Sequence, residues 1–190
     1  YAQVGTPDST GTKLFCVSGQ VAKPGLYEVP FGTTLRSLME LAGGVREGKR
    51  LQAVLLGGAA GAFVTPDELD TPLTFEGVRA IKATIGSGVV IVFDETTDLK
   101  AILLRIAAFF RDESCGQCVP CRVGTVRQEE LLHRLAAMKL NGSLDTERTL
   151  LAEVGQVMRD ASICGLGQTA SSAIESALAK FNLFAGTRSS

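Results

Sequence analysis

The most informative feature of the sequence is the spacing of four of its five cysteines. Three of them are separated by two residues each, and the fourth follows after 42 further residues: Cys115, Cys118, Cys121 and Cys164. Three closely spaced thiolates can wrap around one face of a compact iron–sulfur cubane, and a fourth, brought in by folding, can bind the remaining iron. The spacing therefore predicts one 4Fe–4S cluster, held by these four residues, and a chain that carries electrons.

Other uses of the same cysteines fit less well. Structural zinc usually takes a C-x2-C pair with a distant second pair, which differs from a three-plus-one arrangement. Disulfide frameworks are typical of small secreted domains, whereas this chain has 190 residues and we expect no secretory segment at its start. The tandem ferredoxin run needs a further cysteine soon after Cys121, so we expect one cluster and not two.

The remaining chemically interesting residues have simpler interpretations. Cys16 lies in the apolar run LFCV (residues 14–17), where we expect a buried and inert thiol. His133, the single histidine, lies among leucines of a predicted helix and is expected to be a surface or core residue. The run GGAAG (residues 57–61) lacks the G-x-G-x-x-G order of a phosphate cradle and is expected to be a turn.

Composition excludes several classes of function. The chain is 45% hydrophobic and 21% charged, which is typical of an ordinary soluble protein and not of a disordered one. Its 19 Lys and Arg residues are balanced by 20 Asp and Glu residues, so we expect no nucleic-acid partner. Each apolar stretch is far shorter than the roughly 20 residues that span a bilayer, and we expect no membrane insertion.

The pattern of elements predicts an α+β protein. Residues 1–11 are expected to be a linker, cut from something larger. Residues 12–94 show a hairpin around a Lys-Pro-Gly turn, a helix opened by Thr33 and Thr34, and two later apolar strands. We interpret this region as a small β-grasp-like domain.

Residues 95–190 are predicted to form a four-helix bundle that carries the iron–sulfur cluster. The apolar positions from Leu99 to Phe110 follow a helical period, and three further helices are expected at about 119–139, 145–160 and 168–181. Their apolar stripes are core packing without a cofactor role. The first three cysteines then lie in the turn between the first two helices, and Cys164 lies in the turn between the last two.

Residues next to the cysteines could change the reduction potential of the cluster. Gly116 and Gly165 each directly follow a predicted cysteine ligand. Because glycine has no side chain, backbone N–H groups there could approach the cluster sulfurs. In the alternative interpretation, the two glycines only shape turns. Pro120 is expected to start the second helix, whose N-terminal amides would favour the reduced cluster. Arg122 either holds positive charge near the cluster or pairs with Glu113.

Two motifs resemble a known family. The segments ESCGQCVPCR (residues 113–122) and SICGLGQ (162–168) are similar to the iron–sulfur signature of the NADH-binding flavoprotein subunit of respiratory complex I. Diaphorase subunits of NAD-linked formate dehydrogenases and NAD-reducing hydrogenases share this signature. The segment VSGQVAKPGLYEV (17–29) resembles the soluble-ligand-binding β-grasp domain that precedes the cluster domain in that family. The likeness covers nearly the whole chain.

The resemblance implies that this chain is the C-terminal part of such a subunit. Its cluster would accept electrons from FMN, which NADH reduces on an N-terminal domain, and pass them to a 2Fe–2S thioredoxin-like subunit and a further iron–sulfur subunit. The chain alone would then be the relay part of an NADH:acceptor oxidoreductase and not catalytic. Val123 departs from an acidic residue common in the family, whereas Gly165 and Gln168 favour the soluble diaphorases over complex I.

Two other functional classes remain open from the sequence. In one, a metal such as zinc only stabilises the bundle, and the β-grasp domain binds a partner as a scaffold module. In the other, an aconitase-like cluster acts as a Lewis acid, which needs an iron without a cysteine ligand, and Cys164 argues against it. We expect a cytoplasmic protein, because a labile cluster favours a reducing compartment, and a peripheral arm of a membrane complex would look the same.

Overall fold

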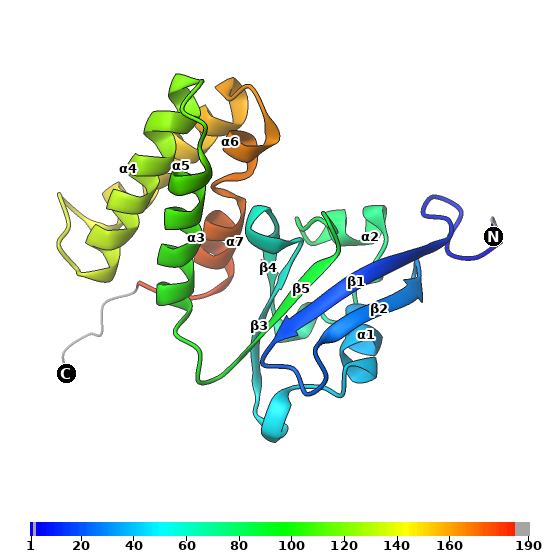
Figure 1. The fold of residues 1–190 in the computed structure, drawn as a ribbon. Helices are drawn as coiled ribbons and strands as arrows, with labels where there is room; N and C mark the ends of the chain where they lie inside the picture. Colours follow the sequence, from blue (N-terminus) through cyan, green and yellow to red (C-terminus); the bar gives the residue numbers. More distant parts are fainter. Residues whose placement is uncertain (2, 185–190) are drawn as a thin grey trace. The chain divides into compact units, whose positions relative to one another are not determined.

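The computed structural model describes Tyr1 and residues 3–184. The chain divides into two compact units, Tyr1–Thr97 and Asp98–Ser190, of which the first contains the β-sheet and the second is helical (Figure 1). In the described part of the chain, no helix is both long and apolar enough to cross a membrane.

The first unit is built on a mixed β-sheet of five strands among the described residues. The strands are β1 (Thr12–Gly19), β2 (Gly25–Pro30), β3 (Leu51–Leu56), β4 (Ala62–Val64) and β5 (Val89–Asp94). Their order across the sheet is β2-β1-β5-β3-β4, and the pair β1 and β5 is parallel while the other neighbours are antiparallel. This sheet and the helical second unit confirm the predicted α+β class.

Two short helices pack with the sheet in a common hydrophobic core. They are α1 (Leu35–Leu41) and α2 (Phe75–Ala80), and 3-10 turns lie at Arg46–Gly48, Gly58–Ala60 and Pro66–Glu68. Thr34 is the N-cap of α1, because its side chain accepts a hydrogen bond from the Ser37 N–H at 3.1 Å. The core combines inward residues of the strands, such as Phe15, with Leu38 of α1 and Val78 of α2.

The strand β1 corrects one expectation. Cys16 is exposed, whereas the sequence pattern predicts a buried thiol. Because side chains alternate across a strand, Phe15 and Val17 face the core and place Cys16 on the opposite face. An apolar run alone does not show which of its residues face inward.

Residues near the N-terminus pack against this unit. Gly5 and Thr10 form an isolated β-bridge, and Ser9 is buried. The Ser9 hydroxyl donates to Glu76 Oε2 at 2.7 Å and accepts from the Phe75 N–H at 3.1 Å, both in the first turn of α2. The segment expected to be a linker therefore has specific contacts with the sheet unit.

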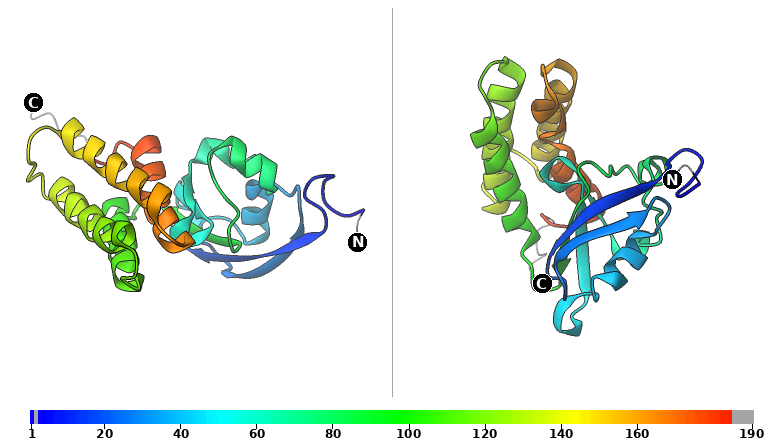
Figure 2. Two further views of the ribbon diagram at one scale, coloured as in Figure 1. Left: turned by 90° about the horizontal axis from the view of Figure 1, so that it is seen from above. Right: turned by 45° about the vertical axis from the view of Figure 1, so that its right-hand side comes forward.

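The second unit contains three long helices and two short ones among its described residues. They are α3 (Leu99–Glu113), α4 (Val119–Ala136), α5 (Leu144–Ala161), α6 (Gly165–Thr169) and α7 (Ser172–Lys180). The helix α4 packs against both α3 and α5, as two further views show (Figure 2). Asp98 caps α3 and Ser143 caps α5, since each side chain accepts a backbone N–H of the first turn.

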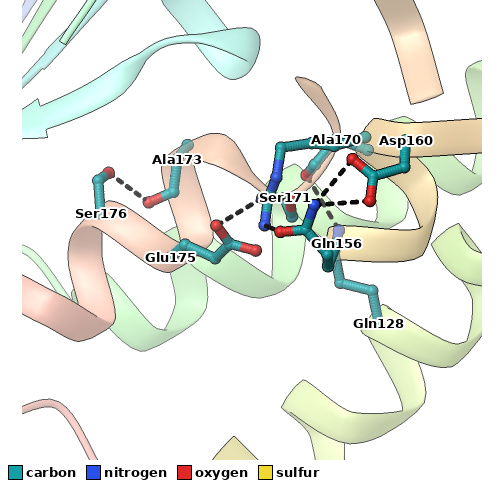
Figure 3. A network of polar contacts seen from close by, with 9 residues as sticks. Gln128, Gln156, Asp160, Ala170, Ser171, Ala173, Glu175 and Ser176 are labelled. Carbon is teal, nitrogen blue, oxygen red and sulfur yellow. Dashed lines mark hydrogen bonds and ion pairs between the residues drawn. The ribbon is translucent and has the colours of Figure 1, made fainter. Parts of the chain in front are cut away.

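The fourth predicted helix is divided in two, contrary to the expectation of one helix at residues 168–181. Polar side chains of neighbouring helices bind the break between α6 and α7 (Figure 3). Gln128 of α4 donates to the Ala170 carbonyl oxygen at 3.0 Å, and Arg159 of α5 donates to the Ser171 hydroxyl at 3.0 Å. The first bond satisfies a backbone carbonyl group at the break, the second holds a side chain there, and both donors lie on other helices.

Candidate metal centre

Helix ends position the four cysteines of the predicted site. Cys115 lies in the loop between α3 and α4, Cys118 is the N-cap residue of α4, and Cys121 lies in the first turn of that helix. Cys164 is the N-cap residue of α6. All five cysteines of the chain are free thiols, and Cys16 belongs to the other unit.

The structure brings the four cysteines to one cavity of about 310 Å³. The remaining lining residues come from these two loops and the adjoining ends of α3 and α6: Glu113, Ser114, Gln117, Ile163 and Leu166. In the described part of the chain, no three His, Cys, Asp or Glu side chains converge closely enough for a single metal ion. A 4Fe–4S cluster takes one thiolate per iron, so its ligands surround a volume and need not meet at one point. The four cysteines around a cavity fit such a cluster.

The loop before α4 is held by its own polar groups. Gly116 has a φ of +76°, a left-handed conformation that glycine adopts without a steric cost. Its N–H donates to the Ser114 hydroxyl at 3.4 Å, and its carbonyl oxygen accepts from Arg122 Nη1 at 2.8 Å. The partner of Arg122 is therefore this carbonyl group, in the loop that carries Cys115.

The loop around Cys164 is packed tightly against α4. A Cβ atom at Gly167 would lie 2.9 Å from Cys121 Cβ and even closer to the Ser162 side chain, so no larger residue fits there. Gln168 Nε2 donates to the Ser162 carbonyl oxygen at 3.0 Å and ties α6 to the end of α5. A Cβ atom at Gly165, in contrast, would meet no other atom of this structure within 4 Å.

The protein environment shifts the pKa of two cysteines in opposite directions. Backbone N–H groups of Ile163 and Cys121 lower the pKa of the Cys118 thiol. Burial raises the pKa of the Cys121 thiol, and the hydrogen bond with Ser114 partly opposes this rise. Since a metal ligand must be a thiolate, the donors around both sulfurs favour the form that binds iron.

Sequence reasoning assigns no structural role at this site to Ser162, Gly167 or Gln168, because no local pattern shows their contacts. The SICGLGQ motif contains all three, but the closeness of Gly167 to Ser162 and Cys121 and the bond from Gln168 to Ser162 depend on how α6 packs. His133 lies exposed on α4 with Nε2 3.8 Å from Glu129, and it is not part of the cavity.

Iron–sulfur proteins bind their clusters through cysteine thiolates. The four free cysteines that surround one cavity of the helical unit form a site of this kind. Comparisons with known families identify the class more closely. Residues 101–184 match the model of the NADH-ubiquinone oxidoreductase-F iron-sulfur binding region, and residues 14–60 match the SLBB domain. The two matches identify an iron–sulfur binding region preceded by an SLBB domain, and the cofactor that the first match indicates is a 4Fe–4S cluster.

Relatives along the whole chain agree with this assignment. The chain is 38% identical over 181 residues to the F subunit of the NADH-quinone oxidoreductase of Mycobacterium tuberculosis. It is 35% identical over 182 residues to the HndC subunit of the NADP-reducing hydrogenase of Solidesulfovibrio fructosivorans. These matches cover 95% of the chain but only 40% and 36% of the relatives. The chain thus spans less than half the length of these curated relatives.

A solved structure of similar fold comes from the same group of proteins. The NAD+-reducing [NiFe]-hydrogenase in its H2-reduced state contains a chain with a TM-score of 0.80 and 39% identity, matched over 94% of this chain and 30% of that one. The resemblance inferred from the two cysteine motifs is confirmed by these comparisons. A relation to formate dehydrogenases remains a prediction.

Proposed function

We propose that this chain passes electrons through one 4Fe–4S cluster as part of an NADH-linked flavoprotein oxidoreductase subunit. We further propose that the cluster ligands are Cys115, Cys118, Cys121 and Cys164. The observation that carries the proposal is the single cavity that all four cysteines line, although 42 residues separate the last two in sequence. When bound, the cluster supplies one-electron transfer without the making or breaking of bonds to substrate.

Groups of this chain would bind and tune the cluster. The thiolates of the four cysteines would each bind one iron, and the apolar side chains of Ile163 and Leu166 would border the site. Cys118 and Cys121 lie at the N-terminus of α4, an 18-residue helix whose dipole favours negative charge at that end. The guanidinium of Arg122 adds a positive charge in the adjoining turn. Both effects would favour the reduced form of the cluster.

The wider electron path belongs to the same proposal. FMN and NAD(H) would bind in the parent subunit outside the residues of this chain, and electrons from the flavin would reach the cluster one at a time. The acceptors would be iron–sulfur clusters in partner subunits, such as a 2Fe–2S thioredoxin-like subunit. Support comes from the NADH-linked and NADP-linked relatives and from the hydrogenase structure. A cytoplasmic location remains part of this proposal.

A series of cysteine variants tests the ligand assignment. Each of the four cysteines is replaced by serine in the full chain, the cluster is reconstituted anaerobically, and iron and sulfide are measured per chain. Each variant should lose most of the four-iron cluster, since serine is a poor substitute for a thiolate. Cys16→Ser is the matched control, because Cys16 lies in the sheet unit, and it should retain wild-type iron content.

Two outcomes would contradict the proposal. An intact four-iron cluster in Cys164→Ser would exclude Cys164 as the fourth ligand. Stoichiometric zinc in place of iron in the unaltered chain, with no redox activity, would replace electron transfer by a structural role for the metal.

A further inference from the structure

Two serine hydroxyls lie beside the inner cysteines of the site. Ser114 directly precedes Cys115, and Ser162 lies two residues before Cys164. The two serines come from opposite loops: the Ser114 hydroxyl contacts Cys121 Sγ, and the Ser162 side chain packs against Gly167, next to Cys121. Hydroxyl groups in such places can donate hydrogen bonds to sulfur ligands.

Ser114 can act only as the donor in its hydrogen bond with a metal-bound Cys121. The Ser114 hydroxyl oxygen lies 3.3 Å from Cys121 Sγ and accepts the Gly116 N–H at 3.4 Å. A metal-bound thiolate carries no proton and can only accept a hydrogen bond. The Ser114 O–H is therefore the donor to Cys121, which is itself only 5% exposed and shielded from competing water.

The Ser162 hydroxyl is buried without a partner. The residue is only 6% exposed, and its oxygen has no group of the described residues within hydrogen-bond geometry. A buried polar group without a partner is costly, and an acceptor is expected beside it. A Cβ atom at Gly167 would overlap Ser162 Oγ and lie 2.9 Å from Cys121 Cβ, so the absence of a side chain at Gly167 lets the serine hydroxyl pack beside the cysteine site.

We propose that Ser114 and Ser162 are positioning residues that raise the reduction potential of the bound cluster: Ser114 donates a hydrogen bond to the thiolate sulfur of Cys121, and the buried hydroxyl of Ser162 donates one to a sulfur of the same site. This inference rests on the proposed function. The added electron spreads negative charge onto the sulfurs, so a hydrogen bond to sulfur is stronger in the reduced than in the oxidised cluster. Removal of either hydroxyl should make the potential more negative.

The test is a redox titration followed by EPR on the full chain with its cluster reconstituted. Ser114→Ala and Ser162→Ala should each shift the midpoint potential to more negative values, and the double variant should shift it further. Ser143→Ala is the matched control, because Ser143 caps the N-terminus of the 18-residue helix α5, whereas Cys164 follows the C-terminus of that helix. This control should retain the wild-type potential.

The possible outcomes separate a failure of the serine inference from a failure of the proposed function. A wild-type potential in both alanine variants, with full iron content, would overturn the inference and leave the proposed function intact. If Ser162→Ala fails to bind a cluster, Ser162→Thr, which keeps the hydroxyl, should restore both cluster and potential; a threonine variant without a cluster would contradict the role of that hydroxyl. Absence of a redox-active cluster in the unaltered chain would instead refute the proposed function.

Discussion

Arg122 extends back from the first turn of α4 and donates a hydrogen bond from Nη1 to the Gly116 carbonyl oxygen at 2.8 Å. From the sequence alone, Arg122 could either place a positive charge near the cluster or form an ion pair with Glu113. The bond to Gly116 instead links the helix to the left-handed residue that follows the first ligand. This geometry holds the loop of Cys115 and keeps the guanidinium close to the site.

The first prediction concerns this link. Arg122→Gln should shorten the lifetime of the reconstituted cluster in air about fivefold, because one hydrogen bond contributes about 1 kcal/mol. The cluster absorbance is followed over time after exposure to oxygen. Arg127→Gln is the matched control, since Arg127 lies on the same helix in an exposed ion pair with Glu130. Equal lifetimes in the two variants would contradict the positioning role of Arg122.

A second prediction contrasts two glycines of the Cys164 loop. Gly167→Ala should destabilise the metal-free protein by about 1–3 kcal/mol, because the new methyl group would collide with Ser162 and Cys121 Cβ. Gly165→Ala should have no such cost, since its methyl group would enter open space. Urea unfolding of both variants gives the comparison. Equal stability would mean that the loop relaxes around Gly167 more easily than its contacts indicate.

The close approach of α4 and α5 leads to a third prediction. A Cβ atom at Gly124 would lie 2.5 Å from Met158 Cγ and 2.6 Å from its Sδ. Gly124→Ala should therefore destabilise the protein by about 1–2 kcal/mol. In combination with Met158→Ala the loss should be smaller than the sum of the single losses by at least about 0.5 kcal/mol. Strict additivity in urea unfolding would show that the two residues do not compete for space.

A fourth prediction concerns a buried carboxylate. Glu147 Oε2 lies 2.8 Å from Arg134 Nη2, and its Oε1 accepts the Asn141 N–H at 2.8 Å. The hydrogen bond from Arg134 lowers the pKa of Glu147 below its ordinary value. A lowered pKa in the folded state stabilises the protein above the ordinary pKa, and this contribution is lost as the pH falls through the lowered value.

Glu147→Gln should accordingly reduce the free energy of unfolding by about 1.5–3 kcal/mol at pH 7, and this difference should shrink as the pH falls below about 4.5. Denaturant unfolding at several pH values measures it. The control is Glu153→Gln on the exposed face of α5, which should change stability little at any pH. A Glu147 difference independent of pH would assign the loss to packing and not to charge.

Local sequence signals predict much of the fold. The helical period from Leu99 to Phe110 corresponds to α3, and the Lys-Pro-Gly turn corresponds to the β1–β2 hairpin. Residues with a strong local pattern are predictable because neighbours in sequence determine their conformation. The short strand β4 and helix α2 lack such a pattern, and sequence reasoning misses them.

The errors arise where distant residues determine the structure. The break between α6 and α7 depends on Gln128 and Arg159, which belong to other helices. The spacing of the cysteines identifies the candidate ligands, because three-plus-one thiolates have few other uses. It does not reveal Ser162 or Gly167, whose roles arise only from the packing of two loops against α4.

The most direct test of the central claim is EPR of the anaerobically reconstituted chain, reduced with dithionite, together with iron and sulfide analysis. We predict a reduced 4Fe–4S signal and about four irons and four sulfides per chain, the stoichiometry of one cubane. An EPR-silent chain that binds zinc, or that binds no iron with its four cysteines intact, would contradict the electron-transfer function.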